Sequence, residues 1–143
     1  MKSESVSSEW SALLALQRAT HATLQVLSAE LVDLDLTASE INALANLADR
    51  GALNVRELSA ETGTRATTWT GVLDRLENRG YLTRELDATD RRSFRLPLTE
   101  AGQAVAERIQ AAVAALERDA LGRLSPTQVA GFHAVVAALQ AAS

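Results

Sequence analysis

The fold of this chain is decided by the stretch Asp87-Ala-Thr-Asp90-Arg91-Arg92-Ser-Phe94-Arg95-Leu96-Pro97-Leu98-Thr99. A turn-prone acidic segment meets an arginine pair, a few residues alternate as in a β-strand, and a threonine suited to cap a helix follows. Residues 81–85 alternate in the same way. We therefore expect a two-stranded hairpin with strands at 81–85 and 93–98 and a loop at 87–92. Pro97 is tolerable there because both strands of a hairpin are edge strands.

Two helices joined by a glycine turn are predicted immediately before the hairpin. Asn54-Val-Arg-Glu57 is a capping box that opens the first helix, and Gly63 closes it. We expect Thr64 to cap the second helix and Gly80 to end it. The residues expected to face inward are Leu58 and Ala60 on the first helix and Trp69, Val72, Leu73 and Leu76 on the second. A short helix, a turn, a longer helix and a hairpin make a winged helix-turn-helix, which is a DNA-reading unit.

Longer helices are predicted on both sides of this unit. Residues 8–32 carry apolar side chains at three- and four-residue steps and also outside one stripe, so a second subunit is expected to cover them. Thr37-Ala-Ser-Glu40 is a capping box for a helix that ends at Gly51 in the left-handed conformation. Thr99 caps a long helix, and Ser125-Pro-Thr-Gln128 opens the last one.

Composition narrows the function classes. The chain has 143 residues, 47% of them apolar and 3% aromatic, which suits one mainly helical domain. The sequence holds no cysteine, and we expect no disulfide, metal site or cofactor. The net charge of the chain is −4. The segment from Thr64 to Arg95 is nevertheless basic, because it contains seven arginines and five acidic residues. We see no signal peptide or membrane-spanning run and expect a cytoplasmic protein.

The residues from Leu36 to Gly102 resemble the MarR family of bacterial transcription regulators. The resemblance is carried by Arg56-Glu-Leu-Ser59, by Val72-Leu-Asp-Arg-Leu-Glu77 with Gly80, and by the hairpin from Asp87 to Thr99. It implies one domain over residues 1–143, with dimerisation helices at 8–35 and 103–143 and a DNA-binding lobe at 37–102. It further implies a homodimer, palindromic DNA sites and, often, release by a small phenolic or other aromatic ligand.

Two residues depart from the family pattern. Trp69 stands where relatives usually have a small aliphatic residue, and Gly71 where a basic or polar side chain is common. Trp69 lies on the apolar face of its helix, so it is either a bulky core residue or a ring that contacts DNA or ligand. If Gly71 faces the groove, one base contact of relatives is missing, so the operator sequence does not carry over to this chain.

The DNA-reading residues follow from the helix-turn-helix and its wing. The major groove admits the second helix, and the predicted contacts on it are Thr64, Arg65, Thr67, Thr68, Thr70 and Arg75. In the wing loop we expect one of Arg91 and Arg92 to enter a narrow minor groove and the other to meet phosphate or an acid. Asp87, Asp90 and Arg95 are expected to support the loop.

The resemblance implies a ligand site where the dimerisation helices meet the DNA-binding lobe. The candidate lining is the start of the helix after Thr99 together with Trp10, Leu13, His21, Leu24 and Leu44. Two functions stay open: a ligand-released regulator, expected to be a repressor, and a constitutive DNA-binding dimer without an effector. An enzyme is not expected, because no nucleophile motif, phosphate loop or cluster of histidines and acids is present. A purely structural helical dimer would not need the arginine pair.

Overall fold

The computed structural model describes residues 11–143. Its helices and strands, in chain order, are α2 (Ala12–Glu30), the 3-10 helix η1 (Val32–Leu34), α3 (Ala38–Arg50), α4 (Val55–Thr62), α5 (Ala66–Asn78), β1 (Glu85–Leu86), β2 (Phe94–Arg95), α6 (Glu100–Leu121) and α7 (Pro126–Ala141). They form two compact units, residues 28–113 and residues 11–27 with 114–143. We call the first the winged lobe and the second the helical unit. The predicted fold class, mainly helical with a winged helix-turn-helix, is confirmed.

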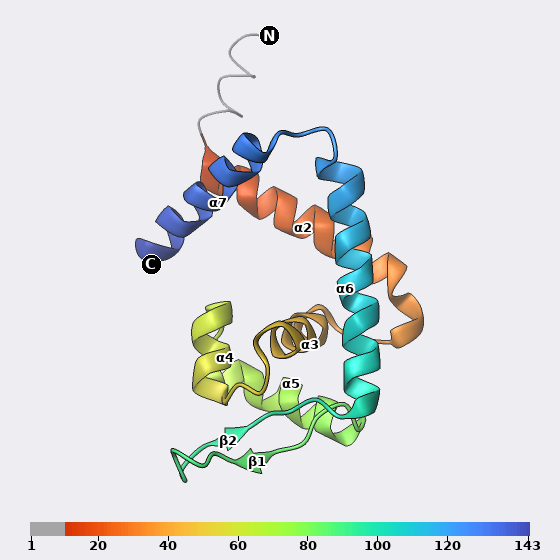
Figure 1. Ribbon diagram of the computed structural model, residues 1–143, viewed down its shortest axis with the longest axis vertical. Helices are drawn as coiled ribbons and strands as arrows, with labels where there is room; N and C mark the ends of the chain where they lie inside the picture. Colours follow the sequence, from red (N-terminus) through yellow and green to blue (C-terminus); the bar gives the residue numbers. More distant parts are fainter. Residues whose placement is uncertain (1–10) are drawn as a thin grey trace. The chain divides into compact units, whose positions relative to one another are not determined.

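The core of the winged lobe lies where α3, α4 and α5 pack on one another (Figure 1). Helices α3 and α5 each place an apolar stripe inside this core, and α4 contributes Leu58. The fully buried large side chains are Trp69, Leu44, Leu47, Leu58, Leu73, Leu76, Leu82, Leu96 and Ile109. Removing such residues from water is the main term that stabilises a lobe of this size. One inward assignment is wrong: Ala60 is exposed, because the short helix α4 turns only Leu58 into the core.

Helix starts agree closely with the capping boxes of the sequence. Thr37, Asn54 and Ser125 each accept a hydrogen bond from the N–H three residues on, and Glu40, Glu57 and Gln128 return it. At the helix ends, Gly63 closes α4 as predicted, in a left-handed conformation with φ 69° and ψ 9°.

Gly51 differs from its prediction as a left-handed cap. It has a positive φ of 78° but a ψ of −159°. The chain must extend there, because the Leu53 carbonyl accepts a hydrogen bond from the Leu96 N–H at 2.9 Å.

The start of α5 is shifted from its prediction. Arg65, not Thr64, is the N-cap residue, and its side chain makes no capping hydrogen bond. The turn before it is organised by Thr62, whose Oγ1 accepts hydrogen bonds from the Thr64 N–H at 3.3 Å and from the Trp69 indole N–H at 3.2 Å. A contact between α4 and α5 therefore fixes this turn, although no side chain caps α5.

The strands of the wing are shorter than predicted. β1 and β2 pair with Glu85 opposite Arg95 and Leu86 opposite Phe94, and an isolated bridge joins Leu82 to Leu98. In that register Thr83 stands opposite Pro97. The Thr83 N–H donates to the Pro97 carbonyl at 3.1 Å, but proline has no N–H to return the second bond. The hydrogen-bond ladder between the two strands is therefore interrupted at Pro97, although the sequence predicts a continuous strand over residues 93–98.

The turn of the wing is fixed by Asp87, which is 3% exposed. Its Oδ1 accepts hydrogen bonds from the Thr89 N–H at 2.9 Å and the Thr89 hydroxyl at 2.8 Å, and Arg95 Nε lies 3.6 Å from Oδ2. These bonds to Thr89, followed by the charge of Arg95, outweigh burial and hold the pKa of Asp87 below its usual value.

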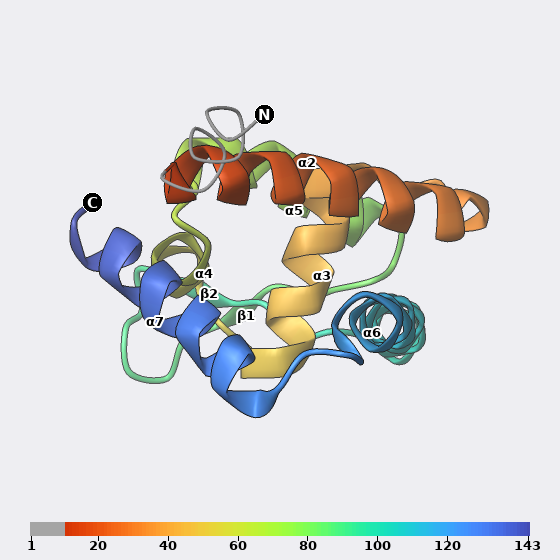
Figure 2. The same cartoon turned by 90° about the horizontal axis from the view of Figure 1, so that it is seen from above.

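Helix α6 starts at a tight junction. The Thr99 Oγ1 accepts a hydrogen bond from the Gly102 N–H at 3.0 Å, and the Thr99 N–H donates to the Tyr81 carbonyl at 3.0 Å. Gly102 lies so close to Tyr81 that a Cβ there would stand 1.8 Å from the carbonyl oxygen. Helix α6 follows this junction, and Figure 2 shows it seen end-on.

Two arginines hold the turn around η1 within the winged lobe. Arg79, at the end of α5, donates to the carbonyls of Asp35 at 2.6 Å and Leu34 at 2.9 Å. Arg108, on α6, pairs with both carboxylate oxygens of Asp33 at 2.6 and 3.1 Å. The helix predicted over residues 8–32 ends earlier than expected, because α2 stops at Glu30 and η1 follows; its residues 8–10 lie outside the described part.

The helical unit has no enclosed core of its own among the residues that are described. Neither α2 nor α7 contains a buried residue. Large apolar side chains of this unit stand exposed, among them Leu13, Leu14, Val26, Leu121, Leu124, Phe132 and Val135. Contiguous exposed apolar surface on helices of this length is typical of an association surface.

Gly102→Ala should destabilise the winged lobe. The new methyl group would overlap the Tyr81 backbone carbonyl, so the start of α6 must shift, with an expected loss of about 1–3 kcal/mol in the free energy of unfolding. Urea unfolding followed by circular dichroism measures it. Gly71→Ala is the matched control, because its methyl group would meet only Arg75 at 3.6 Å, an ordinary contact. Equal stability of both variants would contradict the packing described.

Asp87→Asn should lower stability in a pH-dependent way. The folded state holds the pKa of Asp87 below the ordinary 3.8, so its charge stabilises the fold above that pH. The contribution is lost as pH falls through the folded value. Thermal unfolding of both proteins between about pH 2.5 and 6 should therefore give melting curves that differ most at the upper end and converge at the lower end. A difference that stays constant with pH would show that the charge plays no part.

Candidate nucleic-acid interface

The outward face of α5 carries most of the predicted recognition residues. With Trp69, Val72, Leu73 and Leu76 buried, the opposite side of the helix is open to solvent. Arg65, Thr67, Thr68, Thr70 and Arg75 are all exposed on it, whereas Thr64 is half-buried in the turn before the helix. A helix with one face in the core and a polar opposite face can enter the major groove of DNA.

Trp69 belongs to the core and not to this outward face. Its side chain is 1% exposed, and its indole N–H donates to Thr62. The Thr62 hydroxyl in turn donates to the Leu58 carbonyl at 2.7 Å. The ring therefore locks α4 to α5. Of the two interpretations of this residue, the buried core residue is confirmed.

Gly71 does lie on the outward face, where it is exposed. The Arg75 guanidinium extends back along the helix, with Nη1 3.6 Å from the position of a Cβ on Gly71. The Thr70 hydroxyl donates to the Ala66 carbonyl at 3.2 Å, so its donor is used within the helix. The middle of the outward face thus presents small side chains between the charged groups Arg65 and Arg75.

The wing loop presents its arginine pair to solvent. Arg91 and Arg92 are both exposed. Among residues 11–143 neither takes part in an ion pair. Figure 1 shows the hairpin projecting from the helices of the winged lobe, with this loop at its far end. Exposed guanidinium groups without ion pairs are chemically suited to attract anions such as phosphate.

The acidic side chains of the wing make contacts within the protein. Asp90 accepts a hydrogen bond from the Arg92 N–H at 3.0 Å, and its other oxygen lies 3.5 Å from Arg56 on α4. Arg95 donates to the Ala52 carbonyl and lies 3.9 Å from Glu57 and 3.6 Å from Asp87. Asp87, Asp90 and Arg95 therefore bind the loop to itself and to α4.

Sequence reasoning missed the role of Arg84 and Arg56. Arg84, just before β1, donates to Glu77 and to Asp74 of α5, the latter at 2.7 Å. Both acids stand three residues apart on one helix, so a shared partner could have been inferred from spacing. The pairing of Arg56 with Asp90 joins segments that are far apart in sequence, and no local pattern indicates it.

The candidate ligand-site residues fall in both units: Leu13, His21 and Leu24 belong to the helical unit and Leu44 to the winged lobe. Leu44 is fully buried in the core of the winged lobe. Leu13 is 50% exposed, His21 is exposed and lies 3.2 Å from Gln25, and Leu24 is half-buried. Trp10 lies outside the described residues.

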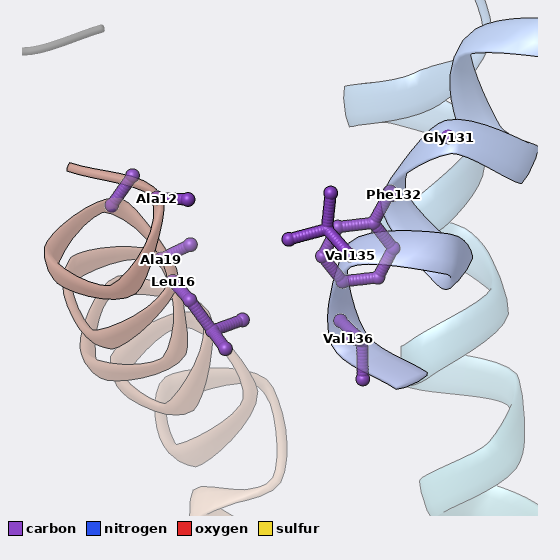
Figure 3. Close-up of a pocket in the computed structure, with 8 residues that line it drawn as sticks. Ala12, Leu16, Ala19, Gly131, Phe132, Val135 and Val136 are labelled. Atoms are coloured by element: carbon purple, nitrogen blue, oxygen red, sulfur yellow. The ribbon is translucent and has the colours of Figure 1, made fainter. Parts of the chain in front are cut away.

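Two hollows in the helical unit are lined by residues other than the candidate ligand-site residues. The first, of about 350 Å³, is lined by Ala12, Ala15, Leu16 and Ala19 of α2 and by Gly131, Phe132, Val135 and Val136 of α7. Figure 3 shows Leu16 and Ala19 facing Phe132 and Val135 across it. The second, of about 450 Å³, is lined by Leu16, Ala19, Thr20, Thr23, Glu117, Leu121, Leu124, Gln128, Val129 and Phe132. Both are walled mainly by apolar side chains.

Within residues 11–143 no three His, Asp or Glu side chains gather in a way that could hold a metal ion. No helix there has the length and apolar character needed to cross a membrane.

Comparison with known proteins identifies the fold and the family. The MarR family model matches residues 34–93, which covers α3, the helix-turn-helix and the loop of the wing. The crystal structure of CouR from Rhodococcus jostii RHA1 bound to p-coumaroyl-CoA is similar with a TM-score of 0.80 and 25% identity, over 92% of each chain.

Two curated relatives are transcription regulators. The uncharacterised HTH-type regulator YfiV of Bacillus subtilis is 35% identical over 50% of this chain, which spans only 44% of that protein. The HTH-type transcriptional repressor Rv2887 of Mycobacterium tuberculosis is 32% identical over 73% of this chain and 76% of the relative. The outward face of α5, the exposed arginine pair and these matches lead to one conclusion: the chain belongs to the MarR family of winged helix-turn-helix, DNA-binding transcription regulators, and not to an enzyme family.

Proposed function

We propose that this protein is a homodimeric repressor that binds a palindromic operator. The observation that carries the proposal is the pair Arg91 and Arg92, exposed and without ion pairs in the described chain, on the same lobe as the open face of α5. In this proposal α5 enters the major groove with Arg65, Thr67 and Thr68, while the wing reaches the adjacent minor groove. Repression is supported by the relative Rv2887, which is named a repressor.

The dimer is supported by the surface of the helical unit. Helices α2 and α7 bury none of their residues within one chain, although their sequences are rich in leucine, valine and alanine. Apolar helices that are open on more than one side need a partner. We therefore assign dimerisation to residues 8–35 and 103–143 and DNA binding to residues 37–102 of a single domain. A two-fold dimer presents two copies of α5, and half-sites about one duplex turn apart match that symmetry.

An aromatic ligand is the effector class that we propose. CouR, similar in fold over 92% of its chain, was solved with p-coumaroyl-CoA, a phenolic thioester. The hollows between α2 and α7 offer the apolar side chains Leu16, Phe132 and Val135 to such a ring. A ligand releases DNA only to the extent that it binds the DNA-free form more tightly. The second candidate is a constitutive dimer with no effector. Either form acts on chromosomal DNA, so we place it in the cytoplasm.

Arg91→Ala and Arg92→Ala should each weaken operator binding without unfolding the protein. Each variant removes one exposed charge from the loop and no buried contact. If the lost group contacts phosphate, the slope of log affinity against log salt should fall by about 0.9. Fluorescence anisotropy over a salt series, with a duplex selected from a random-sequence pool by the wild-type protein, measures both quantities.

Arg108→Ala is the matched control for these variants. It also removes one exposed arginine of the winged lobe, but from α6, where the side chain pairs with Asp33. Its affinity and salt slope should equal those of the wild type. If neither wing variant differs from this control, the wing does not bind DNA, and the proposed mode of recognition fails.

An aromatic acid or its thioester should stabilise the protein and release its DNA. We expect p-coumaric acid or p-coumaroyl-CoA to raise the melting temperature, because a ligand that binds the native state stabilises it by mass action. Leu16→Ala should abolish the response, since Leu16 lines both hollows, whereas Leu13→Ala should keep it. If neither compound raises the melting temperature of the wild type or releases its DNA, a regulator released by aromatic acids is disfavoured. The constitutive dimer without an effector would then be the better candidate.

A further inference from the structure

Asp74 occupies an unusual place for an acid. In an α-helix, residues spaced by four and then three positions share one stripe, and Thr67, Gly71 and Asp74 have this spacing on α5. The Asp74 side chain is 56% exposed. An exposed carboxylate on the face that enters a DNA groove would be repelled by the phosphates, because like charges in close approach are unfavourable. Glu77, one turn away and 40% exposed, adds a second negative charge.

Arg84 lies against both of these acids. One arm of its guanidinium donates to Glu77 and the other to Asp74, at 2.7 Å in the second case. With 26% of its side chain exposed, Arg84 is the least exposed member of the group. It comes from the hairpin, immediately before β1, whereas both acids belong to α5. The planar fork of an arginine can satisfy two carboxylates at once, which the single ammonium of lysine does less well.

We propose that Arg84 is a positioning residue that makes α5 compatible with DNA without itself contacting DNA. It compensates the charge of Asp74 and Glu77 at the point of closest approach and fixes the wing to the recognition helix. The inference rests on the proposed DNA-binding function and deepens it. Direct contact of Arg84 with phosphate is disfavoured because both arms of the guanidinium already serve carboxylates.

The test is a rescue experiment with four proteins: wild type, Arg84→Ala, Asp74→Asn with Glu77→Gln, and the triple variant that combines all three changes. Affinity is measured by anisotropy at fixed salt with a duplex that the wild type selects from a random-sequence pool. Arg84→Ala leaves two acids uncompensated, and its affinity should fall by about tenfold. The triple variant has no acids left to compensate, and its affinity should return to within about threefold of the wild type.

Each outcome bears on the inference. An Arg84→Ala variant that binds as tightly as the wild type overturns it. A triple variant that stays as weak as Arg84→Ala also overturns it, because the arginine would then contact DNA directly or act only through the fold. Arg108→Ala, which breaks an exposed ion pair elsewhere in the lobe, should bind like the wild type.

Thermal unfolding separates a loss of fold from a loss of charge compensation. If Arg84→Ala does not fold, Arg84→Lys takes its place and should give an intermediate affinity, because one ammonium can serve only one of the two acids well. Arg84→Lys binding as weakly as an unrelated protein would contradict the role. A wild-type protein that selects no duplex at all would instead refute the proposed function, and the inference with it.

Discussion

The winged lobe depends on the burial of one face of α5. Trp69, Val72, Leu73 and Leu76 place this face against α3 and α4, and the hydrogen bond from the Trp69 indole to Thr62 fixes its rotation. Because a helix buried on one face exposes the other, the same packing that stabilises the lobe selects which residues can meet DNA. Rotating α5 by a single residue would turn Thr68 or Thr70 toward the core and an apolar side chain toward solvent.

Around this helix, arginine side chains connect separate segments of the winged lobe through ion pairs and through hydrogen bonds to backbone carbonyls. Arg84 joins the hairpin to α5, Arg95 joins it to the segment before α4, and Arg79 joins the end of α5 to the turn around η1. Exposed pairs contribute little free energy one by one. Their shared effect is geometric, because they hold the loop with Arg91 and Arg92 and the open face of α5 as parts of one body.

Much of this arrangement could be predicted from the sequence, and the reasons are local. The capping boxes at Thr37, Asn54 and Ser125 act over three residues, and the apolar stripe of α5 repeats with the helical period, so both can be read without tertiary information. Pro97 marks the limit of such reasoning, since the missing hydrogen bond shows its effect only when the residue opposite is known to be Thr83.

What escaped prediction depends on contacts between distant segments. The cap of α5 moved to Arg65 because Thr62 of α4 and Trp69 of α5 meet, and Arg84 found its partners across the junction of helix and hairpin. The linings of the two hollows were not predicted for the same reason. Leu44 repeats with the apolar stripe of α3 and is core, whereas the hollows bring residues of α2 next to residues of α7, which no periodicity relates.

The short strands of the wing have a consequence for solubility. A hairpin offers two backbone edges on which a strand of another molecule could assemble, and long, flat edges promote aggregation. Here the outer edge of the second strand is occupied at its base, because Asn54 bridges to Arg95 and the Leu53 carbonyl accepts the Leu96 N–H. The open edge belongs to β1, which is two residues long. The hairpin can therefore stand exposed, as a DNA-reading loop must, without serving as a template for intermolecular sheets.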